Sequence, residues 1–570
     1  MQVRVGARAG FCMGVRRALS SALEAALRRR GRIFTLGPLI HNTQVVELLR
    51  RRHVEILARP EDVAPGDLVV IRAHGVPPES MAAIEERGGM ICDATCPHVT
   101  RAQNTVKKAV EAGAHVIIVG DRGHAEVTGL LGFAGGKGHV VENPEEAASL
   151  PPMDFAWVVA QTTQAADTFA AVAEAVRARV PRVEVAATIC GSTSGRQEEV
   201  IGLAHEVDVM VVVGGKHSAN TVRLAEISRR AGVPTVLVET ADELDPAVFK
   251  GCRTAGVTAG ASTPNWIIDE VVERLRLMGR GGPPGAWLRA ACASVMASHV
   301  FVAGGAAALA YAAARLAGVA PGVLPPVLAG LYLFAMQNLN MYIEHRQGDL
   351  VTHRRRALYA RFGHIMAPLG ALSAIASLVL AWIAGPVPFT ILALSTLLGA
   401  LYSVRLAPRA WRYQRLKDIP GSKNVFFAGA LAVVSVLVPA TADGGAFAPT
   451  WALGLAFAWT VTLALARSIT LDMQNMQSDQ FACRETIPVV LGHGPTKLLI
   501  GAGAALCLAG FLCAAALGAV PAARLWYLVA LVHVALYLLV HKRRLFAHGM
   551  VFECIVDSSF YVPALIAALL

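Results

Sequence analysis

Three cysteines in the N-terminal half of this 570-residue chain stand in surroundings that suit metal chemistry. Cys12 lies in AGFCMGV, Cys96 in DATCPHV and Cys190 in TICGSTSG, so small residues beside each would let a bulky group approach the backbone. Because 84 and 94 residues separate them, we expect each to come from a different part of the fold. Three thiolates can bind three irons of a 4Fe–4S cluster and leave the fourth iron open to a substrate. The alternative is three small buried hydrophobic residues, since no compact CxxC motif is present.

A second group of residues combines imidazole, carboxyl, hydroxyl and amide side chains in short loops, most of them rich in glycine. Its members are His41 in GPLIHN, His74 in RAHGV, His124 and Glu126 in DRGHAEVTG, Thr162 in QTT, Ser218 and Asn220 in GGKHSANT, and Ser262 in TAGASTP. Taken singly, such a histidine is usually structural, but together these groups suit an anionic, oxygen-rich ligand. No Walker or GxGxxG loop is evident, which disfavours a nucleotide.

The elements that must position these residues alternate along the first 277 residues. Short apolar runs such as 115–121 and 208–215 end in glycine or a polar residue, and helical segments such as 220–231 follow them. Continuous apolar strands are typical of parallel sheets covered on both faces, and such sheets bind ligands at the carboxyl ends of their strands. We therefore expect an α/β fold of three lobes in pseudo-threefold arrangement around a central cluster, each lobe contributing one cysteine.

The residues after 286 have a different composition. The first 286 contain 32 Lys+Arg and 32 Asp+Glu, whereas the remaining 284 contain 20 and 9, so the whole net charge of +11 lies in the second part. Apolar runs occur there near 290–314, 321–343, 364–384, 387–404, 424–440, 450–469, 497–517 and 522–540, with a ninth at 550–570 interrupted by Asp557. Most reach the ~20 residues that cross a bilayer, so an all-α membrane domain of about nine spans is predicted.

The order of these segments predicts domains and orientation. A Gly/Pro-rich linker, 278–287, separates a domain at 1–277 from one at 288–570. The N-terminal sequence has no apolar segment of signal-peptide length, so we expect the first domain in the cytoplasm of a prokaryote, attached to its cell membrane. If the spans alternate, 18 of the 20 Lys and Arg after residue 286, Arg467 among them, fall in loops on the cytoplasmic side. Basic charge among apolar runs excludes nucleic-acid binding as its explanation.

Nine motifs in the first domain, taken in order, resemble the LytB/IspH family of 4-hydroxy-3-methylbut-2-enyl diphosphate reductases. They are GFCMGV, GPLIHN, RAHGV, DATCPHVT, GDRGHAEVTG, QTT, TICGSTSGRQEE, KHSAN and TAGASTP, between residues 3 and 276. The resemblance implies the last step of the methylerythritol phosphate route to isoprenoids. In that step the hydroxyl group of the substrate is removed reductively, which gives isopentenyl and dimethylallyl diphosphates.

The resemblance also implies roles for single residues. Cys12, Cys96 and Cys190 would hold the 4Fe–4S cluster, whose open iron would act as a Lewis acid on the substrate hydroxyl. Glu126 would be the proton source, Thr162 would orient the hydroxyl and the proton relay, and His124 would be a third catalytic residue. The diphosphate would be bound by His41, His74, His124, Ser218, Asn220 and Ser262. No flavin or nicotinamide motif is visible, so the two electrons would come from a separate donor such as ferredoxin or flavodoxin.

Two polar groups at the predicted cytoplasmic ends of the spans could bind Mg²⁺ and a diphosphate. They are Asn340, Glu344 and Asp349 in NLNMYIEHRQGD, and Asp472, Asn475 and Asp479 in LDMQNMQSD. Offsets of three and four residues place such side chains on one helix face. The alternative for either group is a set of solvated loop carboxylates.

Residues 288–570 resemble UbiA-type intramembrane prenyltransferases in their nine spans, two acidic motifs and the segment LYSVRLAP…KDIPGSKN at 401–424. The resemblance implies Mg²⁺-dependent transfer of a prenyl group to a lipophilic acceptor in the membrane lipid. Lys417, Lys423 and Arg405 are candidates for binding the leaving diphosphate. Both acidic motifs depart from the usual pattern, because Met341 and Asn475 stand where relatives carry Asp.

Three functions follow from these observations. The first is a bifunctional isoprenoid enzyme with both active sites facing the cytoplasm. The second keeps the reductase and makes the membrane half an inactive anchor, in line with the altered acidic motifs. The third is a transporter with a regulatory α/β domain, but transporters bind their substrates near the bilayer midplane, whereas the acidic groups here lie at one face.

Overall fold

The computed structural model describes the chain except for residues 29–30, 41, 279–285, 321, 348–352, 403–414, 443–449, 482–484 and 544–549. It contains two compact units, residues 1–281 and 282–570. The first unit is α/β and the second is helical, which confirms the predicted fold class.

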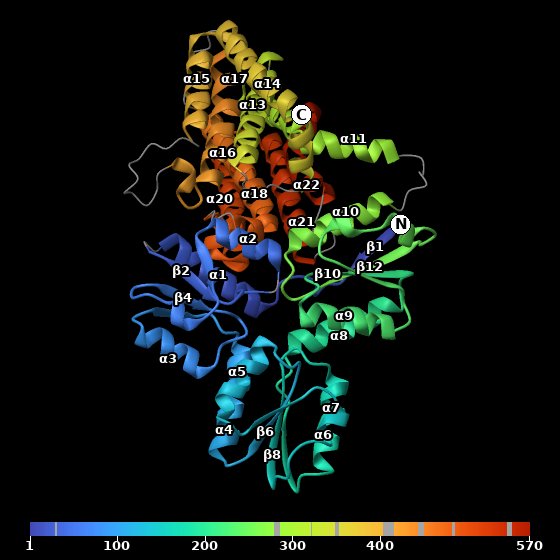
Figure 1. Cartoon of the computed structure of the whole chain (residues 1–570). Helices are drawn as coiled ribbons and strands as arrows, with labels where there is room; N and C mark the ends of the chain where they lie inside the picture. Colours follow the sequence, from blue (N-terminus) through green and yellow to red (C-terminus); the bar gives the residue numbers. More distant parts are fainter. Residues whose placement is uncertain are drawn as a thin grey trace. The chain divides into compact units, whose positions relative to one another are not determined.

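Twelve strands among the described residues form three separate four-stranded sheets, in which every neighbouring pair is parallel (Figure 1). The first lobe has the order β1 (Gln2–Val5), β12 (Thr254–Ala259), β10 (Val209–Val213), β11 (Thr235–Val238). The second has β5 (Met90–Asp93), β4 (Leu68–Ile71), β2 (Ile33–Leu36), β3 (Val54–Leu57). The third has β9 (Arg182–Ala186), β8 (Phe155–Ala160), β6 (His115–Val119), β7 (Gly138–Val141).

The three lobes repeat one connection. In each lobe one edge strand, β1, β5 or β9, leads into a helix that carries the chain to the next lobe. These linking helices are α1 (Met13–Arg28), α4 (Pro97–Glu111) and α8 (Gly191–Ala204). The remaining helices of this unit are α2 (Thr43–Arg51), α3 (Pro78–Glu86), α5 (Ala125–Ala134), α6 (Pro144–Ala147), α7 (Ala166–Arg177), α9 (Ala219–Arg230) and α10 (Asn265–Met278), with short 3-10 turns at Pro60–Asp62, Ala241–Glu243 and Pro246–Phe249. The predicted pseudo-threefold arrangement of lobes is therefore confirmed.

The central strands are buried because most of their side chains are apolar, and the few polar ones, such as Thr35 of β2 and Thr258 of β12, are buried with them. All five residues of β10, VMVVV, are inaccessible to solvent, and the four residues that follow His115 in β6 are also buried. Helices therefore have to cover both faces of each sheet.

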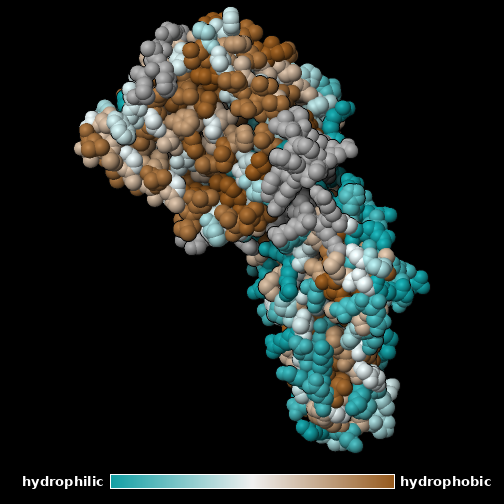
Figure 2. All heavy atoms as spheres, turned by 90° about the vertical axis from the view of Figure 1, so that its left-hand side faces the viewer, coloured by the Kyte–Doolittle hydropathy of each residue, from teal (hydrophilic) through white to brown (hydrophobic). Residues whose placement is uncertain are grey.

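The second unit consists of helices whose surface is largely apolar in the view of Figure 2. In order they are α11 (Ala286–Ala297), α12 (Val300–Ala317), α13 (Leu324–Gln347), α14 (His353–Ala384), α15 (Pro386–Leu401), a 3-10 turn (Leu416–Asp418), α16 (Ser422–Ala432), a π-helix (Val433–Leu437), α17 (Val438–Thr441), α18 (Trp451–Phe481), α19 (Ile487–Leu491), α20 (His493–Ala516), a 3-10 helix (Ala522–Leu528), α21 (Val529–Arg543), α22 (Met550–Asp557), a 3-10 turn (Ser558–Phe560) and α23 (Val562–Leu569).

Seven helical segments among the described residues are long and apolar enough to cross a membrane. They are Val300–Ala317, Leu358–Ala384, Ser422–Thr441, Trp451–Met476, His493–Ala516, Ala522–His541 and Val551–Leu569. The other two predicted spans correspond to α13, which contains Asn338 and Asn340, and to α15, which has 16 residues. This half is thus a membrane domain.

Two details of the predicted spans are wrong. The run 290–314 is not one helix, because α11 ends at Ala297 and His299 adopts a left-handed conformation with φ 66° before α12 begins. The side-chain amide of Asn338 donates to the Ser298 carbonyl oxygen at 3.4 Å and helps to hold this break. Arg467 does not lie in a loop, because α18 continues through it to Phe481.

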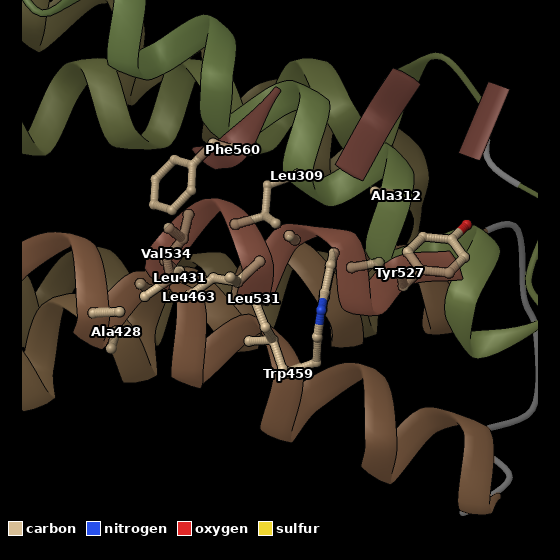
Figure 3. Packing of buried hydrophobic residues seen from close by; sticks show 14 of the residues in the cluster. Leu309, Ala312, Ala428, Leu431, Trp459, Leu463, Tyr527, Leu531, Val534 and Phe560 are labelled. Atoms are coloured by element: carbon tan, nitrogen blue, oxygen red, sulfur yellow. The ribbon is translucent and has the colours of Figure 1, made fainter. Parts of the chain in front are cut away.

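The core of the second unit forms around α18. Of the 18-residue apolar stretch within Trp451–Met476, 67% is buried, the highest share among the candidate spans. Trp459 of α18 packs edge-to-face on Tyr527, with ring centroids 5.6 Å apart. Figure 3 shows Leu309 of α12 and Leu531 of α21 in the same core. The central position of α18 fixes where its polar C-terminal half lies.

Candidate functional site

Each of the three predicted ligand cysteines occupies the same place in its lobe. It follows the edge strand β1, β5 or β9 and directly precedes the linking helix α1, α4 or α8. In each case the cysteine backbone N–H donates to a carbonyl oxygen just beyond the neighbouring central strand. These bonds are Cys12 to Ala261 at 3.2 Å, Cys96 to Ala73 at 3.0 Å and Cys190 to Thr162 at 2.9 Å. Thiolates at helix N-termini are stabilised by the helix dipole and the first N–H groups.

The three thiols are close enough to influence one another. Burial raises the pKa of the Cys96 thiol, backbone N–H groups of His98 and Val99 lower it, and charge on Cys12 and Cys190 raises it further. Gly14, two residues after Cys12, packs against Cys96 so tightly that an added Cβ would lie 2.5 Å from its Sγ. The first and second lobes therefore meet at these two cysteine loops.

Arg196 is a site residue that the sequence analysis missed. Its guanidinium group is buried, and it donates to the Ala259 carbonyl oxygen at 2.6 Å and to that of Gly10 at 2.9 Å. Burial lowers its pKa, while the thiols of Cys12 and Cys190 raise it. This buried cation is therefore near enough to Cys12 and Cys190 to interact electrostatically with them, and it would offset thiolate charge. The only sequence signal was its place in the TICGSTSGRQ motif.

Glu126 and Thr162 are in contact after neighbouring central strands, β6 and β8, of the third lobe. Glu126 is 1% exposed and lies in the first turn of α5. Its Oε1 accepts from the Thr162 backbone N–H at 2.6 Å, and its Oε2 accepts from the Thr162 hydroxyl at 2.9 Å. Burial raises the pKa of Glu126 to about 7, although both hydrogen bonds lower it. A carboxyl group with that pKa can serve as a proton donor near neutral pH.

The predicted anion-binding histidines also follow central strands. His74 comes after β4 and His124 after β6, and their rings lie edge-to-face with centroids 5.2 Å apart. This contact brings the second and third lobes together. The Nδ1 atom of His124 accepts from the Glu126 backbone N–H at 3.2 Å, so this imidazole also caps α5. His41 lies outside the described residues.

The first lobe supplies the remaining polar residues. Ser218 and Asn220, at the start of α9 after β10, are 4% and 6% exposed, and Ser262 follows β12 and is half-buried. Among the described residues, the Nδ2 atom of Asn220 has no hydrogen-bond partner. A buried amide donor without a partner is costly, so it suits an acceptor-rich ligand. Ser218 makes no capping bond with its side chain.

An ion pair also missed by the sequence analysis joins the first and third lobes. Arg223 of α9 donates to Asp121 Oδ1 at 2.9 Å and to the Thr163 carbonyl oxygen at 3.0 Å. Gln161, fully buried, accepts from the Asp121 backbone N–H at 2.8 Å. These bonds fix the loops that carry Glu126 and Thr162. Arg223 gave no signal, because it stands mid-helix without a motif.

In the membrane half, the second acidic motif lies within α18. Asp472 is 2% exposed; its Oδ1 accepts from the Lys423 ammonium at 2.6 Å and its Oδ2 from the Asn424 amide at 2.8 Å. Asn475 donates to the Leu471 carbonyl oxygen at 3.1 Å. Both oxygens of Asp472 are thus engaged by α16.

The other predicted residues of this half are only partly described. Asn340 and Glu344 are half-buried on α13, Asp479 is 5% exposed on α18, and Lys417 lies in a 3-10 turn. Asp349 and Arg405 lie outside the described residues. Lys423, which was predicted only as a candidate for binding the diphosphate, contacts Asp472 of the second motif in the structure.

Comparison with known proteins gives a family-model match for each half. The family model described as LytB protein matches residues 3–276. A 4-hydroxy-3-methylbut-2-enyl diphosphate reductase of Geobacter sulfurreducens is 46% identical over 276 residues, which cover 48% of this chain and 97% of that protein. One of Aquifex aeolicus is 42% identical over 279 residues and 96% of its length. The chain belongs to the LytB family.

The membrane half has relatives of its own. The UbiA prenyltransferase family model matches residues 293–549. A solved structure of a UbiA homolog from Archaeoglobus fulgidus bound to GPP and Mg²⁺ is 18% identical, covers 48% of this chain and 97% of its own, and has a TM-score of 0.36. For the LytB half, a solved (E)-4-hydroxy-3-methyl-but-2-enyl diphosphate reductase is 42% identical and covers 49% of this chain, with a TM-score of 0.40.

The cysteine centre of this LytB-family chain fits an iron–sulfur cluster. Among the described residues, no three His, Cys, Asp or Glu side chains are arranged around a single metal ion. A cluster of four irons is wider than one ion, because each thiolate binds a different iron. The three equivalent cysteine positions, the helix N-termini and the buried Arg196 are consistent with that larger group.

Proposed function

We propose that the LytB half reductively dehydroxylates 4-hydroxy-3-methylbut-2-enyl diphosphate to isopentenyl and dimethylallyl diphosphates. One observation carries the site assignment. The buried Glu126, whose pKa is about 7, accepts a hydrogen bond from the Thr162 backbone N–H, and the carbonyl oxygen of the same Thr162 accepts one from the Cys190 backbone N–H. The proposed proton donor and a predicted cysteine ligand are therefore both hydrogen-bonded to Thr162. The relatives that are 42–46% identical over the same residues support this activity.

The reaction breaks the substrate C–O bond, consumes two electrons and two protons, and releases the oxygen as water. A bound cluster, held by Cys12, Cys96 and Cys190, would pass on single electrons and act as a Lewis acid. Protonated Glu126 gives its proton to the departing oxygen, and the Thr162 hydroxyl orients that oxygen. His74, His124 and the Asn220 amide bind the diphosphate, together with the residues that the sequence adds: His41, Ser218 and Ser262.

The test is anaerobic purification of the full chain, followed by iron and sulfide analysis and reduction of the hydroxylated diphosphate with dithionite and methyl viologen. We expect about four irons for each chain and both five-carbon products. A matched Cys190→Ser variant should lose iron, whereas Cys252→Ser, which lies outside the three cysteine positions, should keep it. A protein with full iron and no product would refute the proposed reaction.

For the membrane half, we propose transfer of a prenyl group from its diphosphate to a lipophilic acceptor, supported by the UbiA family match. The oxygen donors Glu344, Asp472 and Asp479 suit Mg²⁺. Asp472, however, is paired with Lys423 at 2.6 Å. We therefore infer that the prenyl diphosphate draws Lys423 away and that Mg²⁺ then takes its place beside the carboxylate.

This order of binding is measurable with Mn²⁺ as a spectroscopic substitute for Mg²⁺. The full chain should bind Mn²⁺ at this half only when a prenyl diphosphate is present, and transfer of the prenyl group should need the metal. A Lys423→Met variant should bind Mn²⁺ without the diphosphate, because its Asp472 has lost the competing cation. Equal Mn²⁺ binding by both proteins would refute the exchange, and absence of transfer with every prenyl diphosphate would favour the inactive anchor.

The proposed orientation places the LytB half and both sites in the cytoplasm, where a soluble donor such as ferredoxin or flavodoxin can reach the cluster. Its support is the bias of Lys and Arg towards alternate loops. Labelling of Cys292, which is exposed, with a membrane-impermeant maleimide would test it. Labelling in inverted but not in right-side-out vesicles is expected, and the reverse would overturn the orientation.

A further inference from the structure

A groove with a volume of about 760 Å³ lies beside Cys96, outside the substrate-binding residues named above. Thr95 and Pro97, the two neighbours of this cysteine, both line it. Its walls come from α1, through Arg17, and from the third lobe, through Trp157 and Ala186. All three lobes or their linking helices therefore border this groove.

One face of α4 forms the floor. The residues that line the groove from this helix are Pro97, Thr100, Arg101, Asn104, Thr105 and Lys108. Their spacing of three and four residues is that of a single helix face. Because α4 begins at the residue after Cys96 and rises about 1.5 Å per residue, this polar face leads from the cysteine to Lys108 over roughly 18 Å.

The groove is basic. Arg17, Arg101 and Lys108 are exposed, and among the described residues Asp93 is the only carboxylate that lines it. Oδ1 of Asp93 already accepts from the Thr95 backbone N–H at 2.9 Å. The LytB half carries as many acidic as basic residues in total, so this excess is local rather than a general property of the domain. Local charge of one sign attracts a partner of the other sign and orients it.

We propose that this groove is the docking surface for the protein that supplies electrons, an acidic carrier of single electrons. The inference rests on the proposed reductase function, which consumes two electrons in each turnover. The carrier would bind over Arg17, Arg101 and Lys108 and bring its redox group to the Cys96 side of the cluster. Two reduced carriers, each oxidised by one electron, supply one turnover, and the two protons come from Glu126 and solvent.

The open groove suits a protein surface better than the substrate. The residues assigned to the diphosphate follow the central strands of the sheets, whereas the groove follows the edge strand β5 and the outer face of α4. Electrons can therefore enter without displacing substrate. A small anion such as inorganic phosphate is the alternative occupant, and the test distinguishes the two.

The test compares two reductants on the full chain. Reduced flavodoxin, an acidic protein, reports docking, and methyl viologen with dithionite reports the chemistry alone. In an Arg101→Glu/Lys108→Glu variant we expect the KM for flavodoxin to rise roughly tenfold or more, with the viologen-driven rate within twofold of the unchanged protein. Added salt should raise the KM of the unchanged protein and have little effect on the variant.

A matched control carries the same change of charge elsewhere. Arg229 and Arg230 are exposed in the last turn of α9 and do not line the groove, so Arg229→Glu/Arg230→Glu should leave the flavodoxin KM unchanged. Equal loss in both variants, or loss of the viologen-driven rate alone, would overturn the proposed surface. Displacement of flavodoxin by millimolar phosphate at constant ionic strength would assign the groove to a small anion instead.

Docking can also be measured without turnover. Fluorescence anisotropy of labelled flavodoxin should show a Kd that rises about tenfold in the groove variant and not in the control. If the unchanged protein binds flavodoxin at the groove but never reduces the hydroxylated diphosphate, the docking surface stands and the proposed reaction fails. If the unchanged protein turns over with viologen, but it and the groove variant bind flavodoxin with the same Kd, the proposed reaction stands and the docking surface is refuted.

Discussion

At the scale of single residues, Glu126 is the group whose removal should separate catalysis from cluster binding. Its carboxyl accepts two hydrogen bonds from Thr162 and contacts no cysteine ligand in the bonds described. A Glu126→Gln variant keeps the shape but loses the acid, so kcat should fall by roughly 10²–10⁴-fold while iron content stays unchanged. Glu145→Gln, an exposed glutamate of the same lobe, is the control. Normal turnover of the Glu126 variant would remove this residue from the mechanism.

The pKa of Glu126 also predicts how the rate depends on pH. Burial raises this pKa from 4.5 to about 7, and the donor form is the protonated one, so kcat/KM should fall as pH rises through about 7. The Thr162 hydroxyl stabilises the carboxylate and so lowers the pKa. In Thr162→Val the descending limb should therefore move to higher pH, in addition to any loss of rate. A limb that stays in place would show that another group titrates.

At the scale of elements, the cluster site depends on how closely α1 approaches the Cys96 loop. A Cβ at Gly14 would lie 2.5 Å from Sγ and 2.9 Å from Cβ of Cys96, so Gly14→Ala should push these loops apart. We expect iron content to fall to less than half, while the fold, measured by circular dichroism, is kept. Gly202→Ala in α8, where nothing lies within 4 Å, is the matched control and should keep full iron.

The packing of α22 on α18 depends on a buried ion pair. Arg467 and Asp557 are joined at 2.7 Å with side-chain exposures of 9% and 7%, and Phe427 and Phe560 cover the guanidinium. Removing one partner leaves a buried charge, so Asp557→Asn should cost about 3–5 kcal/mol of stability. The double variant Arg467→Met/Asp557→Leu should regain most of it. Thermal unfolding in detergent measures both, and equal loss in the two would contradict this account.

How far the sequence predicts these elements depends on the range of the interactions. The strands at 115–121 and 208–215 were predictable because apolar periodicity is local, and the lobe of each cysteine followed from its position along the chain. The break at His299 was not predictable, since it is held by Asn338 from another helix. Arg467 was assigned to a loop for the same reason: only its distant partner, Asp557, makes burial of the charge tolerable.

The site shows the same division. Glu126 and Thr162 were predicted through motifs and do meet, since parallel neighbouring strands bring their carboxyl ends together. Arg196 and Arg223 were missed because their hydrogen bonds join residues far apart in the sequence. The partners of Arg196 are 63 and 186 residues away, and those of Arg223 are 60 and 102 residues away. The engagement of Asp472 by Lys423 was likewise invisible, because it requires α16 and α18 to be packed side by side.

At the scale of the whole molecule, the two halves should function separately. Each forms its own compact unit, and the reductase relatives match 48% of this chain with 97% of their length, so they consist of little besides the LytB half. The two halves also differ in their requirements: one has balanced charge and buried parallel sheets, and the other has apolar spans that need lipid. Neither core depends on the other for its apolar contacts in the clusters described.

We therefore expect residues 1–277, expressed alone, to remain in the soluble fraction, to bind iron as the full chain does, and to keep the viologen-driven rate within about twofold, because that site lies wholly within one unit. Residues 288–570 should partition into membranes and keep any prenyl transfer. The control is the full chain with the linker residues 278–287 doubled, which should match the unchanged protein in both assays. A soluble fragment that folds but cannot hold iron would mean that the membrane half contributes to the cluster site, and the proposed division at 278–287 would then be wrong.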